Sequence, residues 1–455
     1  MKLLVKVAGL AVLASGSAAA FAGDTVAGRW DAQLVRNENV VPFRLDISGS
    51  GPTLKGTLYD GFRPYEDTTS ASFKDGKLVL NIEHYLTTIT AKLDHGKLVG
   101  NVVAQNRENR ADYEFVATRH VDAPAPAAAV SVPKIDGAWE IPLETPTSKG
   151  EKAFRFIVEQ RGADVAGSIL RVDGDTGAFS GTFKEGKWVL SHYDGSRPGV
   201  IVVTPTQEGT LEILQRIDRP QQAAADTSAH DKSYGENAPD GRYAPKLVAY
   251  RSEVARVKGF PEPANYLTHT TVRDPKEQFT FNFPDVTGKL VSSEDPRFKG
   301  KVVLAIVTGT WCPNCHDEAQ YLVELDKKYR DKGLAIVALD FEEVEQQASL
   351  SRVHAFVKQY GVTYPYLIAG APAEMWEKVP QLVNLNTWPA TVFVGRDGTV
   401  RAVHSGFASP ASVQFHAQLR KEFTERIEQL LEENASPAVT VSDAASAVSE
   451  AAHKL

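Results

Sequence analysis

Cysteine is nearly absent from this sequence, since 455 residues contain only Cys312 and Cys315. A fold held together by several disulfides is therefore excluded. Positive charge is not in excess, because 50 Lys and Arg face 57 Asp and Glu for a net charge of −7, which argues against a nucleic-acid partner. After the first 22 residues no apolar run approaches membrane length, so no membrane span is expected. The 11 histidines are scattered without ligand spacing, so the sequence predicts no metal site.

The first 22 residues have the three parts of a secretory signal. Lys2 and Lys6 supply positive charge, residues 7–13 form a short apolar region, and Ala20-Phe21-Ala22 provides a cleavage site. No cysteine follows the apolar region, so a lipid anchor has no attachment point. The sequence predicts a protein that is exported to the periplasm or another extracytoplasmic compartment.

Residues 23–121 consist of short alternating runs separated by turn signals, a pattern typical of β-strands. Residues 134–251 repeat this pattern at offsets of 109 to 111 positions, which indicates an internal duplication. The segments at these offsets are Gly28–Trp30 with Gly137–Trp139, Leu54–Leu58 with Val165–Ile169, and Phe73–Leu80 with Phe183–Leu190. Just downstream, His84-Tyr85 also corresponds to His192-Tyr193. An Ala- and Pro-rich linker, residues 122–133, joins the copies, and residues 218–242 form a polar insert that we expect to be disordered. Each copy has the size of a small barrel or sandwich. The His-Tyr dipeptides fit packed residues, with a ligand site as the alternative.

Residues 252–275 form a connector, and strand and helix patterns alternate through residues 276–434. The expected elements are a hairpin over 279–292, strands over 302–307, 334–341 and 364–369, a helix from the cysteine pair to about 330, helices over 353–360, 373–378 and 412–433, and a hairpin over 389–404. This order predicts a mixed, mostly parallel sheet covered by helices. Residues 435–455 are expected to be a disordered tail. The fold class is multidomain, with a duplicated all-β N-terminal region followed by an α/β domain.

The two cysteines lie where the strand over 302–307 ends and a helix begins. At this position the Cys-x-x-Cys spacing brings the two sulfurs close enough for a disulfide, and the unpaired N–H groups of the helix favour a thiolate at Cys312. Cys315 lies about one turn further in and is expected to be buried. The sequence therefore predicts a redox-active disulfide in which Cys312 is the nucleophile and Cys315 the resolving thiol. A purely structural disulfide is the alternative, although its loop would be too short to stabilise much.

Glu318 is the third candidate, because it lies three positions after Cys315 on one helix face. A partly desolvated carboxyl beside the buried sulfur could accept and return its proton. The alternative is a solvated glutamate on the helix surface.

Residues 276–434 contain four features of one known kind, namely Gly300-Lys-Val-Val303, Thr310-Trp311-Cys312-x-x-Cys315, Glu318, and Trp388-Pro389-Ala-Thr-Val-Phe393. With these features the region resembles the thioredoxin superfamily, and more narrowly the TlpA/ResA-like exported thiol–disulfide oxidoreductases. The resemblance implies a thioredoxin-like fold and dithiol–disulfide exchange without a cofactor. It also implies protein disulfide or dithiol substrates and an upstream redox partner.

The same resemblance assigns further roles. In that family the proline of the last motif is cis and packs against the disulfide, so Pro389 would position the substrate backbone. Trp311 and Trp388 would be substrate-binding residues. Plain thioredoxins bury an Asp six residues before the first cysteine, where this chain has Ile306, whereas TlpA-like proteins place a Glu where Glu318 stands.

The chain also departs from the family, which usually has proline just before the second cysteine, whereas Pro313 follows the first. Because residues between the cysteines tune the redox potential, the direction of electron flow stays open, with disulfide reduction as the expected direction. His316 either helps to stabilise a thiolate or lies on the helix surface.

Three other functions stay open. A peroxiredoxin-like thiol peroxidase would need Pro-x-x-x-Thr-x-x-Cys, but Ala305 and Gly309 occupy the Pro and Thr positions. Cys312-x-x-Cys315-His316 matches a c-type haem attachment pattern, although a preceding buried strand is atypical of that class. In a non-enzymatic protein, the duplicated β region would bind a ligand or envelope partner and carry the thioredoxin-like domain as a passenger.

Overall fold

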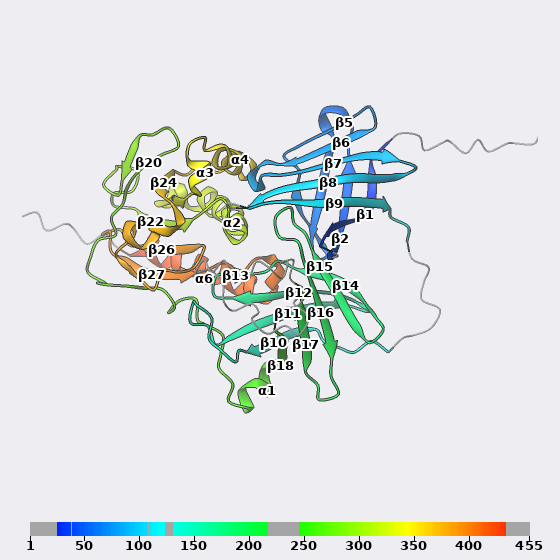
Figure 1. Ribbon diagram of the computed structural model, residues 1–455. Helices are drawn as coiled ribbons and strands as arrows, with labels where there is room; N and C mark the ends of the chain where they lie inside the picture. Colours follow the sequence, from blue (N-terminus) through cyan, green and yellow to red (C-terminus); the bar gives the residue numbers. More distant parts are fainter. Residues whose placement is uncertain (1–24, 38, 107–108, 123–130, 217–244, 434–455) are drawn as a thin grey trace, which may run out of the picture.

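The computed structural model describes residues 25–37, 39–106, 109–122, 131–216 and 245–433 (Figure 1). The predicted signal peptide, the insert at 218–242, the tail at 435–455 and most of the linker lie outside the described residues. Two β domains, at the right of the view, lie against an α/β domain at the left (Figure 1). None of the helices within the described ranges is long and apolar enough to cross a membrane.

The first β domain is one antiparallel sheet of nine strands in the order β4-β3-β2-β1-β9-β8-β7-β6-β5. Its elements are β1 (Gly28–Arg36), β2 (Asn39–Ser48), η1 (Gly51–Thr53), β3 (Lys55–Asp60), β4 (Arg63–Asp67), β5 (Ser70–Lys74), β6 (Lys77–Ile82), η2 (Glu83–Tyr85), β7 (Thr87–Asp94), β8 (Lys97–Asn106) and β9 (Asn109–Arg119). Alternate strand residues point inward and surround the buried Trp30. Among the described residues no ladder joins β4 to β5, so the sheet is an open half-barrel. Thr68 and Thr69 narrow the gap by donating their N–H groups to the Gly56 and Asn81 carbonyls, both at 2.8 Å.

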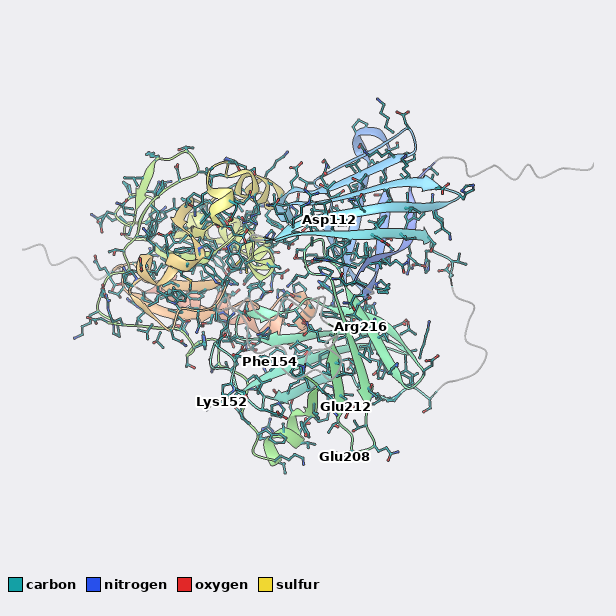
Figure 2. All side chains as sticks on the ribbon, in the orientation of Figure 1. Asp112, Lys152, Phe154, Glu208, Glu212 and Arg216 are labelled. Carbon is teal, nitrogen blue, oxygen red and sulfur yellow. The ribbon has the colours of Figure 1, made fainter. Side chains whose placement is uncertain are left out.

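The second β domain is closed. Its elements are β10 (Gly137–Pro142), β11 (Ala153–Arg161), β12 (Asp164–Arg171), β13 (Gly174–Asp175), β14 (Phe179–Lys184), β15 (Lys187–His192), β16 (Gly199–Pro205), β17 (Leu211–Gln215) and β18 (Leu247–Arg251). Strand β11 pairs with both β10 and β12, which closes an eight-stranded barrel, and β13 extends β12. Figure 2 shows Glu208, Glu212 and Arg216 along the β16–β17 side of this barrel. The two β domains are thus separate sheets, as the predicted all-β region allows.

The segment after β15 joins the two β domains. Tyr193 packs its ring edge-on against Phe43 of the first domain, with centroids 4.8 Å apart. The Thr87 hydroxyl donates to the Gly195 carbonyl at 2.8 Å, and Arg63 forms an ion pair with Glu159 at 2.7 Å. Because Tyr193 belongs to the first domain's hydrophobic core, the two β domains are packed as neighbours rather than only tethered.

The α/β domain is built on a five-stranded sheet in the order β24-β23-β22-β26-β27. Its elements and the segment leading to it are α1 (Ser252–Val257), β19 (Thr271–Val272), β20 (Asn282–Pro284), β21 (Leu290–Ser292), β22 (Val302–Thr308), α2 (Pro313–Tyr329), η4 (Arg330–Lys332), β23 (Leu334–Phe341), α3 (Val344–Gln347), α4 (Ser351–Tyr360), β24 (Tyr366–Gly370), η5 (Pro372–Glu374), α5 (Met375–Lys378), β25 (Leu382–Val383), β26 (Ala390–Val394), β27 (Val400–Ser405), η6 (Pro410–Ser412) and α6 (Gln414–Glu432). The prediction of a thioredoxin-like α/β domain is confirmed. The sheet is less parallel than expected, because two ladders are parallel and two are antiparallel. The difference arises because the terminal hairpin β26–β27 joins the central strand β22 in antiparallel fashion.

The continuous apolar run of β22 is explained by burial on both faces of the sheet. Val302, Leu304 and Ile306 face a core that includes α2, α4 and α6. Val303 and the other alternate residues face a second core with α5 and the segment before β20. Strand β22 is therefore buried along its whole length. The residues that follow it lie at the end of the sheet that faces the β domains.

Candidate active site

The cysteine pair lies at the start of α2. Cys312 is the N-cap residue, with extended backbone angles of φ −96° and ψ 113°, and Pro313 begins the helix. The N–H of Cys315 donates to the Cys312 carbonyl at 3.0 Å. Only 4% of Cys312 and 2% of Cys315 is exposed, and both are free thiols. The turn after β22 thus holds the two sulfurs together at the helix N-terminus.

The two thiols have different surroundings. Burial raises the pKa of Cys315 well above its ordinary value, and the hydrogen bond with Cys312 adds to the rise. Cys315 is therefore a protonated thiol at neutral pH. The Cys312 sulfur lies 3.6 Å from the Trp388 carbonyl, to which its S–H donates. Of the two cysteines, Cys312 is the one at the N-terminus of α2. Its sulfur also adjoins the loop between β25 and β26, which contains Trp388.

That loop brings Trp388 and Pro389 to the cysteines, and Trp311 directly precedes Cys312 in the turn after β22. The Trp388–Pro389 peptide bond is cis. The Trp311 and Trp388 rings meet edge to face at 5.1 Å, and the Trp311 indole N–H donates to the Phe341 carbonyl at 2.9 Å. Both tryptophans are partly exposed, so together they form an aromatic wall beside Cys312.

Glu318 is buried, with 1% of the residue exposed, which excludes the solvated alternative. Burial raises the pKa of Glu318 to about 8, and a hydrogen bond from the Thr391 hydroxyl to Oε1 limits the rise. Its second oxygen, Oε2, has no hydrogen-bond partner among the described residues. A carboxyl with this pKa can exchange a proton near neutral pH.

A family model described as Redoxin matches residues 271–417. The thiol-disulfide oxidoreductase ResA of Bacillus thuringiensis (strain Al Hakam) is 34% identical over 125 residues, which cover 28% of this chain and 65% of that protein. The thioredoxin-like protein YneN of Bacillus subtilis (strain 168) is 31% identical over 137 residues, which cover 30% of this chain and 73% of that protein. The C-terminal domain therefore belongs to the ResA-like proteins of the thioredoxin superfamily.

A crystal structure of a DsbF homologue from Corynebacterium diphtheriae is also similar to the chain, with 21% identity and a TM-score of 0.29 over 38% of this chain and 98% of that one. The chain spans 65% of the length of the ResA protein that it matches. The matched family region begins after β18, so both β domains lie outside it.

The surroundings of His316 in this ResA-like domain do not fit a c-type haem attachment site at Cys312-x-x-Cys315-His316. His316 is fully buried, and its two ring nitrogens lie 2.7 Å from the Thr310 carbonyl and 2.9 Å from the Tyr360 hydroxyl. Burial lowers the pKa of His316 well below its ordinary value, so the ring is neutral. Both expectations for His316 are therefore wrong, because it is neither a surface residue nor a cation for a thiolate.

His316 is covered instead by the first β domain. The Tyr85 ring stacks on it with centroids 4.3 Å apart, and the His84 ring lies at 5.4 Å. His84 also lies 3.3 Å from Glu66, which accepts a hydrogen bond from Tyr360. Sequence reasoning singled out the His-Tyr dipeptide but could not connect it to the cysteine motif. The repetition of the dipeptide at matching positions in the two copies was the only feature of the sequence that pointed to it.

The next residue, Asp317, also contacts the first β domain. Its carboxylate accepts a hydrogen bond from the Tyr65 hydroxyl at 2.8 Å. Burial raises the pKa of Asp317 well above its ordinary value, although the Arg197 guanidinium opposes the rise. The start of the redox helix therefore packs against residues of the β domains, and one oxygen of Asp317 finds its hydrogen-bond partner there.

The stacking of Tyr85 on His316 makes a prediction about stability. Replacing Tyr85 with alanine removes a buried ring from the interface and should lower the free energy of unfolding by about 3 kcal/mol. Tyr85→Phe is the matched control, because it keeps the ring and removes only a buried hydroxyl that has no hydrogen-bond partner among the described residues. It should leave the free energy of unfolding unchanged or raise it by about 1 kcal/mol. Urea unfolding followed by circular dichroism measures both, and equal losses in the two variants would contradict the packing argument.

Proposed function

We propose that the chain is an exported thiol–disulfide oxidoreductase that reduces disulfides in protein substrates through Cys312 and Cys315. The Cys312 thiolate attacks one sulfur of the client disulfide, forms a mixed disulfide and displaces the other client sulfur as a thiolate, which takes up a proton. Cys315 then loses its proton to Glu318 and attacks the Cys312 sulfur. The second client sulfur leaves as a thiolate and takes up a proton, and two electrons have passed from the cysteine pair to the client.

The observation that carries this proposal is that a buried Cys315 thiol and a buried Glu318 carboxyl lie three positions apart on one helix. A protonated thiol cannot attack a disulfide, so the resolving step needs a base inside the domain. Glu318 supplies one whose pKa of about 8 allows it to take a proton and give it back. The partly exposed Trp311 and Trp388 form the adjoining surface on which a client segment would bind, and the buried Pro389 would position the client backbone. The Trp388 carbonyl already lies beside the Cys312 sulfur.

The relatives support the reaction class, because the similar Bacillus proteins are named thiol-disulfide oxidoreductases. Each turnover in the reductive direction leaves a Cys312–Cys315 disulfide, so an upstream dithiol partner must return two electrons. Residues 1–22 support export of the mature chain, since they contain a charged start, an apolar stretch and a small-residue cleavage site.

We also propose that residues 23–121 and 134–251 are two copies of one unit. Trp30 and Trp139 support this, because each donates its indole N–H to the carbonyl four residues earlier at 2.8 Å. Arg119 and Arg251 place their guanidinium groups over these rings, at 4.1 and 3.9 Å. The tryptophans are 109 positions apart, and each arginine lies on the last strand of its domain, so the shared arrangement supports a duplication.

Reduction of insulin by the full mature chain, with dithiothreitol as electron donor, tests the proposed activity. We expect insulin to precipitate much faster than with dithiothreitol alone. Rapid peroxide consumption without disulfide reduction would instead favour a thiol peroxidase. If the folded protein catalyses neither reaction, the thioredoxin-like domain is not catalytic and the proposal is overturned.

A further inference from the structure

The second β domain holds the residue between the two cysteines. The Asn314 side-chain Nδ2 donates to the Asp173 carbonyl at 2.9 Å, and Arg197 donates from a guanidinium nitrogen to Asn314 Oδ1 at 3.3 Å. Gly174 packs closely against the Asn314 side chain, because a Cβ added at Gly174 would lie only 2.7 Å from Asn314 Nδ2. Both ends of the amide are therefore engaged by a domain that lies outside the matched thioredoxin-like region.

Arg197 is itself firmly placed. Its Nε donates to Asp194 Oδ2 at 2.8 Å, and Asp194 also accepts from the backbone N–H groups of Ser196 and Arg197, both at 2.9 Å. Asp194 is fully buried, so this ion pair fixes the guanidinium rather than leaving it to sample solvent. Arg197 also lines a cavity of about 30 Å³ together with Tyr85, Trp311 and Pro313. The arginine thus belongs to the wall of the redox site.

The first turn of α2 explains why holding Asn314 matters. Pro313 has no N–H, and the N–H groups of Cys315 and His316 donate to the Cys312 carbonyl, so the Asn314 N–H and the helix dipole remain to stabilise negative charge on the Cys312 sulfur. They do so only when the first turn is held in place. A thiolate carries this charge and a disulfide does not. A rigid first turn therefore stabilises the reduced form of the pair relative to the oxidised form.

We propose that Arg197 is a positioning residue that acts through Asn314 to set the redox equilibrium of Cys312 and Cys315. This inference rests on the proposed function, and it gives the second β domain a role in the redox chemistry. The relevant reaction is exchange with glutathione disulfide, in which the Cys312 thiolate and Cys315 thiol become one disulfide while one glutathione thiolate and one glutathione thiol are released.

The test measures this equilibrium in glutathione redox buffers for the full mature chain. Arg197→Ala should favour the oxidised pair about tenfold more than wild type, which equals about 30 mV for a two-electron couple. Arg197→Lys should restore part of the shift. Asn314→Ala should produce a similar shift, and the double variant should shift no further, because both changes remove the same restraint.

Arg63→Ala is the matched control, because Arg63 makes an interdomain ion pair with Glu159 that joins the two β domains instead of contacting Asn314. It should leave the equilibrium unchanged. A folded Arg197→Ala protein with the wild-type equilibrium overturns the inference, as do additive shifts in the double variant. If Arg197→Ala does not fold, a wild-type equilibrium in Asn314→Ala overturns it. Absence of any reversible equilibrium in the wild type would instead overturn the proposed function.

Discussion

Replacing Cys312 with serine should abolish disulfide reduction, whereas replacing Cys315 with serine should leave a protein that accumulates mixed disulfides with its clients. The difference follows from the two positions. Cys312 is at the helix N-terminus and beside the exposed edges of the tryptophans, so it makes the first attack. Cys315 lies one turn further along the helix, and burial raises the pKa of its thiol, so it acts only after a client is attached.

The measurement benefits from the scarcity of cysteine. Because the chain has no cysteine besides these two, every mixed disulfide formed by Cys315→Ser must be on Cys312. Non-reducing electrophoresis of the variant after exposure to an oxidised peptide should show a covalent adduct that dithiothreitol removes. Cys312→Ser should give none, which makes it the matched control. Equal trapping by both variants, or insulin reduction by Cys312→Ser at the wild-type rate, would contradict the assigned roles.

Local patterns predicted the α/β domain well. The apolar run that became β22 and the cysteines at the start of α2 are determined by neighbours in sequence, so periodicity and spacing were sufficient. The hairpin expected over 279–292 is shorter, with strands only at 282–284 and 290–292. Phe279 instead donates its N–H to the Gly398 carbonyl, a partner more than a hundred residues away.

Contacts between domains were beyond the reach of such patterns. His316 has the polar character of a surface helix residue, yet it is buried because Tyr85, more than two hundred residues earlier, stacks on it. Asn314 was considered only as one of the residues between the cysteines, and its partners Asp173 and Arg197 carry no motif. Residues of both β domains therefore contact the start of the redox helix. These contacts join segments that are far apart in sequence, so only the tertiary structure shows them.

Replacing Glu318 with glutamine should slow formation of the Cys312–Cys315 disulfide by about a hundredfold, because glutamine cannot accept the Cys315 proton. In the wild type the rate should rise with pH through about 8, since the carboxyl is mostly protonated below its pKa and becomes an effective base above it. Single-turnover oxidation followed by tryptophan fluorescence measures this rate across pH. Glu318→Gln should lose the rise.

Two further variants identify the group responsible. The Thr391 hydroxyl stabilises the Glu318 carboxylate, so Thr391→Val should move the rise to higher pH without abolishing it. Glu324→Gln changes an exposed carboxyl on the same helix and should leave the profile unchanged. A wild-type pH profile in Glu318→Gln would assign the resolving base to another group.

Unfolding provides an independent check on the same carboxyl. The pKa of Glu318 rises from 4.5 to about 8 on folding, so the folded protein binds a proton that the unfolded chain has released between these values. The stability from this protonation is complete below pH 4.5 and is lost as pH rises through about 8. Relative to Glu318→Gln, the wild type should therefore become less stable over this window in urea unfolding. A stability difference that does not change with pH would show that Glu318 titrates normally, and the proton-transfer role would fail with it.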